Sequence, residues 1–279
     1  MSRWRERLGN SLNLQPGEGP AVAAGLVMFF LLFTGYFMLR PVRETMGIAG
    51  GIDNLQWLFT GTFIATLVCL PLFGWLASRV KRKRILPWTY GFFVSNLVLF
   101  AGLFAVDQQA LWTARAFYIW LSVFNLLAIS LAWSVLADLF STEQGKRLFG
   151  LLAAGASAGG LAGPVLGTLL VAPLGHSGLL LLASLLLLGS IAASAYLQHW
   201  RSQHPLELTA ELPPNKPLGG NPFAGATAVL RSPYLLGIAL FVVLLASVST
   251  FLYFEQARIV SETFTDRTQQ TQVFGLIDS

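Results

Sequence analysis

Charged residues are scarce in this chain. Asp, Glu, Lys and Arg make up 11% of its 279 residues, whereas hydrophobic residues make up 54%. A soluble domain of this size typically has about 25% charged residues. The composition therefore excludes an ordinary soluble protein and predicts an all-α integral membrane protein.

Residues for redox, metal and phosphate chemistry are equally few. Cys69 is the only cysteine, so an intrachain disulfide is impossible. The three histidines, His176, His199 and His204, lack metal-ligand spacing, and no Gly-rich phosphate loop of the P-loop type is present. We therefore expect no metal, no cofactor and no enzymatic activity, and an ATP-driven pump is disfavoured.

Long uncharged runs recur along the sequence. They cover residues 21–39, 55–78, 85–106, 116–137, 148–175, 177–198 and 232–254. Each run is long enough to cross a bilayer as one helix. The Gly-His-Ser-Gly segment at 175–178 separates two of them. The sequence therefore predicts seven membrane spans.

The basic residues gather in particular loops. With an inside N-terminus, thirteen of the eighteen Lys and Arg residues lie on the inside. This bias predicts a multi-pass protein of the cell membrane (the bacterial inner membrane), with a cytoplasmic N-terminus and the lipid bilayer as its partner. Because the +5 net charge is confined to loops instead of one face, we expect no nucleic-acid partner.

Composition also predicts the domain organisation. Residues 1–20 form a cytoplasmic segment, and residues 21–200 form a six-helix transmembrane domain. Residues 201–231 are polar and Pro-rich, which is typical of a cytoplasmic linker. Residues 232–279 supply helix 7 and the start of helix 8 of a second bundle. We expect the chain to be truncated, because one helix does not complete a second bundle.

Internal repetition supports a six-helix half built from two three-helix repeats. Residues 71–76 and 164–169 share the pattern Pro-x-x-Gly-x-Leu, 93 positions apart. The intervals between corresponding spans are similar.

Segment 74–84 resembles the loop between helices two and three of the major facilitator superfamily, Gly-x-Leu-Ala-Asp-Arg-x-Gly-Arg-Arg. Gly74 and Arg79 fit the pattern, while Ser78 replaces its acid and Lys81 its second glycine. We expect Gly74 to permit close helix approach, and the basic run to cap helix ends and contact anionic headgroups. The alternative is a simple topology anchor.

Four residues of span 148–175 resemble the glycine-proline motif of that superfamily's fifth helix. They are Gly159, Gly163, Pro164 and Gly167. Glycines at this spacing let helices touch and slide, and a proline favours a bend. We predict close packing, and the resemblance implies a part in conformational change.

Segments 39–44, 133–150 and 253–260 resemble the ATP:ADP antiporter (nucleotide transporter) family, which is placed with the major facilitators. In plastid and parasite exchangers of that family, a basic residue important for transport falls on Arg43. Those exchangers also carry an acidic residue in helix four, whereas segment 118–125 has no carboxylate.

Five residues are candidates for substrate binding. Arg40 and Arg43 follow the first span; charges at that depth either face a polar cavity or snorkel to headgroups. Asn125 lies in mid-span, where an amide either bonds another helix or lines a cavity. Tyr36 and Tyr253 either line a cavity or belong to an interfacial aromatic belt.

Asp138 and Arg147 flank the connection between the fourth and fifth spans. With Glu143 and Lys146, they predict a capping and ion-pair network that holds this connection. Gating is the alternative role.

The resemblance implies a secondary transporter with two rocking halves, acting as a monomer. Guanidinium groups suit an anionic small-molecule substrate, and the family implies nucleotides exchanged as ATP and ADP. The alternative function is a membrane scaffold or signalling subunit that has the same fold and moves no solute.

Overall fold

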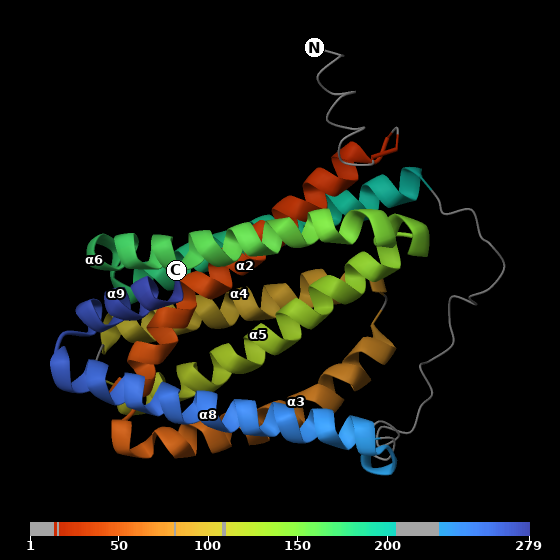
Figure 1. The fold of residues 1–279 in the computed structure, drawn as a ribbon. Helices are drawn as coiled ribbons and strands as arrows, with labels where there is room; N and C mark the ends of the chain where they lie inside the picture. Colours follow the sequence, from red (N-terminus) through yellow and green to blue (C-terminus); the bar gives the residue numbers. More distant parts are fainter. Residues whose placement is uncertain (1–13, 16, 81, 108–109, 205–228) are drawn as a thin grey trace. The chain divides into compact units, whose positions relative to one another are not determined.

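The computed structural model describes residues 14–15, 17–80, 82–107, 110–204 and 229–279. Regular structure in these residues is entirely helical, which confirms the all-α prediction. The elements in chain order are α2 (Gly19–Ala49), the 3-10 turn η1 (Ile52–Asn54), α3 (Leu55–Arg79), α4 (Arg82–Val106), α5 (Leu111–Leu139), α6 (Thr142–Gln203), α8 (Pro233–Thr263) and α9 (Arg267–Asp278) (Figure 1).

Six helices in the described part of the chain are long and apolar enough to cross a membrane: α2, α3, α4, α5, α6 and α8. The 62-residue α6 is interrupted at Gly175, where φ is 65° and ψ is 179°. Glycine adopts this left-handed φ at little steric cost. The two arms of α6 contain the predicted spans 148–175 and 177–198, and the break falls at the segment that predicted it.

A stripe of glycines on α6 packs directly against the backbone of α2. A Cβ atom added to Gly159 would lie 2.6 Å from the carbonyl oxygen of Phe30. One added to Gly163 would lie 2.8 Å from the carbonyl oxygen of Thr34. Because any side chain would collide with backbone at both positions, α2 and α6 can approach this closely only with glycine there. This is the close packing that the glycine spacing predicts.

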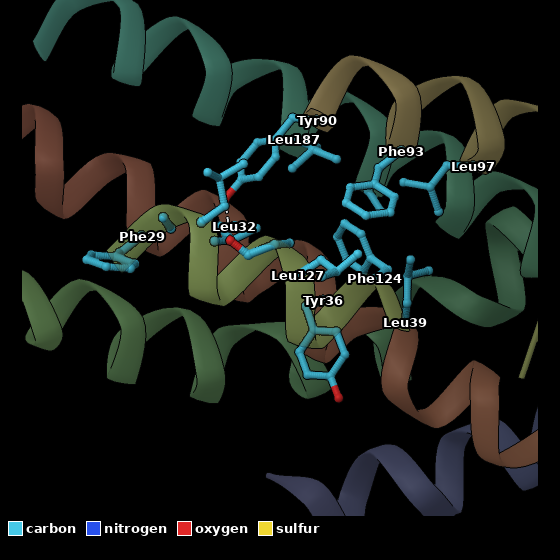
Figure 2. Packing of buried hydrophobic residues seen from close by; sticks show 14 of the residues in the cluster. Phe29, Leu32, Tyr36, Leu39, Tyr90, Phe93, Leu97, Phe124, Leu127 and Leu187 are labelled. Carbon is cyan, nitrogen blue, oxygen red and sulfur yellow. Dashed lines mark hydrogen bonds between the residues drawn. The ribbon is translucent and has the colours of Figure 1, made fainter. Parts of the chain in front are cut away.

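Aromatic and aliphatic side chains of α2, α4, α5 and α6 form the core (Figure 2). Tyr90 is fully buried and donates a hydrogen bond of 2.8 Å to the carbonyl oxygen of Ala128, which joins α4 to α5. Phe93 and Phe124 meet edge to face with ring centroids 4.8 Å apart. Tyr36 belongs to this cluster, and Figure 2 shows its hydroxyl pointing away from the other labelled side chains.

The chain divides into two compact units. One comprises residues 1–206 with 264–279, and the other comprises residues 207–263. Helix α9 belongs to the first unit, where it packs against α2 and α6, and α8 belongs to the second. The predicted linker, residues 201–231, lies largely outside the described residues, and the predicted domain boundaries stay a prediction.

Candidate functional site

Arg43, near the C-terminal end of α2, points toward α5. Its Nη1 donates a hydrogen bond of 3.1 Å to Ser122 Oγ, and its Cζ lies 4.9 Å from the ring centroid of Tyr118. Its side chain is 18% exposed. The guanidinium is therefore held against a neighbouring helix.

Glu44 balances this positive charge. Its Oε1 accepts a hydrogen bond of 2.7 Å from Arg43 Nη2, and its side chain is 5% exposed. A buried charge is tolerated when it is paired and hydrogen-bonded. The two adjacent residues of α2 thus form a partly buried ion pair that is neutral as a unit.

Helix α5 carries a polar stripe beside Arg43. Tyr118, Ser122 and Asn125 are spaced by four and then three residues, which puts them on one helix face. Within the described residues, Asn125 Oδ1 is buried without a hydrogen-bond partner. Buried polar atoms normally have a partner in protein or water, so the stripe can accept a further donor next to the ion pair.

Arg40 is more exposed than Arg43 and reaches α9. Its side chain is 42% exposed, and its Nε lies 3.5 Å from Asp278 Oδ2. Asp278 also interacts electrostatically with Arg43 and Glu44. Arg40, Arg43, Glu44 and Asp278 therefore form a four-charge cluster where α2 meets α9, and we call it the α2–α9 charge cluster.

Buried hydroxyl groups make a second junction between α9 and its neighbours. Thr271 Oγ1 lies 2.7 Å from Thr45 Oγ1 on α2 and 3.0 Å from His176 Nε2 on α6. Thr271 is fully buried. This polar junction joins α9 to α2 and α6.

Comparison with known proteins identifies the family of the chain. A family model described as Major Facilitator Superfamily matches residues 20–265 of the 279. The chain belongs to the major facilitator superfamily. It is thus a multi-pass membrane protein of transporter type, and this membership points away from an enzyme. None of the curated proteins or solved structures compared with the chain matches it significantly.

Two other candidate residues of this superfamily member, Tyr36 and Tyr253, lie in different parts of the structure. Tyr36 is 7% exposed and packs against the rings of Phe37 and Phe124, with centroids 5.0 Å and 6.5 Å away. It joins the core beside the charge cluster. Tyr253 lies on α8, in the second unit. Its part in a substrate site stays a prediction.

The glycine-proline residues of the superfamily's fifth helix lie in the first arm of α6. Pro164 and Gly167 are buried, and a Cβ atom on Gly167 would lie 3.0 Å from the carbonyl oxygen of Met38. The close contact with α2 thus extends from Gly159 to Gly167, about two helical turns. The part that Gly159, Gly163, Pro164 and Gly167 take in conformational change stays a prediction.

Glu18 organises the opposite end of α2, and the sequence analysis did not identify it. Its carboxylate accepts hydrogen bonds from Arg147 Nη2 and Gln144 Nε2, both at 2.9 Å. Burial raises the pKa of Glu18, but hydrogen bonds from the Gln15 backbone, Arg147 and Gln144 outweigh it and hold the pKa below its usual value. Arg201 extends the network by donating to Gln144 at 2.9 Å.

The start of α6 is capped differently from the prediction. Ser141 and Gln144 form a capping box, in which each side chain bonds the backbone of the other residue at 3.1 Å. Asp138 lies exposed in the last turn of α5, and Glu143 is exposed in the first turn of α6. Helix capping at the start of α6 therefore comes from Ser141 and Gln144, and Arg147 pairs with Glu18. The ion-pair and gating roles of Asp138, with Glu143 and Lys146, stay predictions.

The end of α3 corresponds to the superfamily loop pattern. Arg79 is its last residue and is exposed. Among the described residues, a Cβ atom on Gly74 would meet nothing within 4 Å. The close helix approach expected at Gly74 is absent from the described structure, and the gating roles of both residues stay predictions.

The described part of the chain contains no group of three or more His, Cys, Asp or Glu side chains that could hold a metal ion. The groups that contact Arg43 are the hydroxyl of Ser122, the ring of Tyr118 and the carboxylate of Glu44. Ser122 and Glu44 were absent from the sequence-based site. A search for polar residues three or four positions from Asn125 on α5 would have found Ser122.

Proposed function

We propose that this protein is a secondary active transporter that carries an anionic small solute across the membrane by alternating access. The proposal rests on one observation: Arg43 is 18% exposed and is held against α5 by Ser122 and Tyr118. Charged side chains within membrane proteins typically line substrate or ion paths. The planar guanidinium suits a phosphate or carboxylate group, which it binds in bidentate fashion.

Glu44 gives the site a means of exchange. Its carboxylate occupies Nη2 of Arg43 at 2.7 Å, so an incoming anion competes with it for the guanidinium. The solute takes the place of Glu44 when it binds, and Glu44 neutralises Arg43 again when the solute leaves. Asn125 can accept a hydrogen bond from a hydroxyl or amino group on the solute, because its Oδ1 has no partner among the described residues.

Nucleotides are the first solutes to test. Segments 39–44, 133–150 and 253–260 resemble the ATP:ADP antiporter family, and its important basic residue corresponds to Arg43. Phosphate groups match the fork of arginine in geometry and charge. An exchange of ATP for ADP is the mode that this resemblance favours.

We also infer a cytoplasmic N-terminus and a location in the bacterial inner membrane, with the protein acting as a monomer. Thirteen of the eighteen Lys and Arg residues lie on the N-terminal side of the membrane in this orientation. The Arg43 end of α2 then faces the periplasm. Solutes from that side reach the charge cluster first.

Uptake by the full chain in proteoliposomes tests the proposal. The panel contains ATP, ADP, orthophosphate, a dicarboxylate and a neutral sugar, each labelled. The double variant Arg43→Gln/Glu44→Gln removes both charges and keeps the pair neutral, so neither side chain is left as an unpaired buried charge. We expect at least one anion to be transported, and the double variant to lose at least about tenfold in rate, equivalent to one charge-assisted hydrogen bond.

The control is Arg231→Gln, which removes an exposed arginine in front of α8. This variant should transport at the rate of the parent. Equal uptake by the parent and by the double variant would remove Arg43 from the site. Absence of transport for every solute would favour the non-transporting scaffold.

A further inference from the structure

A pocket lies where α3 and α5 begin, and none of its lining residues belongs to the α2–α9 charge cluster. It has a volume of about 510 Å³. Asn54 and Arg115 supply its polar groups, Trp57 and Trp112 supply aromatic walls, and Leu58 and Ile119 supply apolar surface. A basic group flanked by aromatic and apolar side chains in an open pocket suits a ligand that is anionic at one end and apolar at the other.

Arg115 is fixed within this pocket. Its Nε donates a hydrogen bond of 2.8 Å to the carbonyl oxygen of Gly50, and its Cζ lies 5.0 Å from the ring centroid of Trp112. Across the described residues, no carboxylate forms an ion pair with Arg115. The guanidinium is thus oriented by the Gly50 bond and the Trp112 ring, and its two terminal amino groups remain available for an anion.

The loop before α3 is shaped around these polar side chains. Gly51 has φ of +100°, and a Cβ atom there would lie 3.2 Å from Asn54 Nδ2 and 3.6 Å from Arg115 Nη2. A Cβ atom on Gly50 would lie 3.2 Å from Arg115 Cγ. Two successive glycines therefore leave space for the donors of Asn54 and Arg115.

The tryptophans indicate the depth of the pocket in the membrane. Trp57 is 66% exposed and Trp112 is 75% exposed, and both lie in the first turn of a candidate span. Tryptophan is enriched where hydrocarbon meets headgroups. Further along α3, Phe63 and Leu67 are 66% and 61% exposed, which gives the helix an apolar face beside the pocket.

We propose that this pocket binds the phosphate of a phospholipid headgroup. Arg115 binds the phosphate in bidentate fashion, Asn54 donates a further hydrogen bond, and the acyl chains lie along the apolar face of α3. Arginine suits this task because its planar fork matches two phosphate oxygens. The ends of spans lie at the depth of the phospholipid headgroups, where the tryptophans of the pocket are also typical.

The test measures lipid binding to the full chain in an uncharged detergent, by native mass spectrometry and by thermal midpoint. The probes are phosphatidylglycerol, diacylglycerol with the same acyl chains, and inorganic phosphate. We expect phosphatidylglycerol to bind and to raise the midpoint, because a ligand of the native state stabilises it. Diacylglycerol and inorganic phosphate at equal concentration should do neither.

Two variants of pocket residues should bind phosphatidylglycerol more weakly than the parent. Arg115→Gln should weaken phosphatidylglycerol binding by about tenfold or more, the size of a lost charge-assisted hydrogen bond. Asn54→Ala leaves the bond from Arg115 to Gly50 in place, so it keeps the test valid if Arg115→Gln fails to fold. It should weaken binding several-fold. The matched control is Trp88→Ala, which removes a 72% exposed tryptophan outside the pocket and should bind lipid like the parent.

Three results would overturn the assignment. They are parental phosphatidylglycerol affinity in folded Arg115→Gln and in Asn54→Ala, equal binding of diacylglycerol, and equal binding of inorganic phosphate. The last of these would identify a site for a free anion instead of a lipid. Because the transport assay uses a different pair of residues, this proposal and the proposed function can fail separately.

Discussion

Arg43 Nη1 donates a hydrogen bond of 3.1 Å to Ser122 Oγ, although 79 residues separate them in the chain. The bond joins the end of α2 to the middle of α5. It also directs the guanidinium toward a helix face that carries Tyr118 and Asn125. The proposed transport function depends on this orientation.

Ser122→Ala should weaken the binding of a transported anion while leaving the fold intact. The variant removes one hydrogen bond to Arg43, which is worth about 1–3 kcal/mol when one partner is charged. We expect KM to rise about tenfold with a smaller change in kcat. Transport kinetics in proteoliposomes measure both quantities.

Ser247→Ala is the matched control for that variant. Ser122 and Ser247 each donate to the carbonyl oxygen four residues earlier in their helix, at 3.1 Å and 2.8 Å. Only Ser122 also accepts a hydrogen bond from Arg43. Equal KM values for the two variants would show that the Arg43 contact does not support binding.

Gly159→Ala should destabilise the packing of α2 against α6. A Cβ atom at Gly159 lies 2.6 Å from a backbone oxygen of α2, whereas one at Gly160 meets only the Phe37 ring, at 3.8 Å. Overpacking typically costs about 1–3 kcal/mol. At Gly160 the alanine should be neutral or stabilising by up to about 1 kcal/mol, because alanine favours helix. Thermal midpoints in detergent compare the two neighbours, and equal midpoints would contradict the close contact.

The lowered pKa of Glu18 predicts that the protein loses stability in acid. Its folded-state pKa is lowered, so the unfolded chain binds the proton more readily. Stability from Glu18 is complete above the unfolded-state pKa and is lost as the pH falls through the folded-state pKa. Thermal midpoints of the parent should therefore fall when the pH drops below about 4.5, close to the ordinary value for glutamate.

Glu18→Gln should lower the free energy of unfolding at neutral pH by about 1–3 kcal/mol, which lowers the thermal midpoint. It should also make the midpoint depend less on pH in acid. Glu143→Gln is the control, since Glu143 is exposed in the first turn of α6. It should keep the acid dependence of the parent. An unchanged pH profile in Glu18→Gln would assign the acid effect to another group.

Asp278→Asn should have little effect on stability. The Asp278 side chain is 13% exposed, but its partner Arg40 is 42% exposed and lies 3.5 Å away. An ion pair whose cation is accessible to solvent contributes about 0–1 kcal/mol. The remaining contacts of α9, such as the junction of Thr271 with Thr45 and His176, stay in place. The thermal midpoint should change by less than in Glu18→Gln, and a larger drop would give the α2–α9 charge cluster a structural role.

The helices could be predicted from sequence because a bilayer requires long uncharged runs. The break at Gly175 was predictable for a related reason, since a glycine-rich, polar segment interrupts such a run. The spacing of Gly159 and Gly163 likewise indicated a close helix contact. These features are local, and each can be read within one helix or at its ends.

The contacts between distant segments were not predictable in this way. Arg43 finds Ser122 across 79 positions, and Glu18 finds Arg147 across 129. Both pairs depend on the rotation of one helix against another, which a single sequence does not specify. The cap of α6 could have been predicted, because Ser141 and Gln144 have the spacing of a capping box. The sequence analysis instead assigned capping to the charged residues around them.

The most direct measurement is an anion titration followed by thermal midpoint, comparing the parent with Arg43→Gln/Glu44→Gln. If Arg43 binds the solute, the parent midpoint should rise with the concentration of the transported anion, by mass action. The midpoint of the double variant should stay constant. Equal rises in the two proteins would contradict an anion site at Arg43.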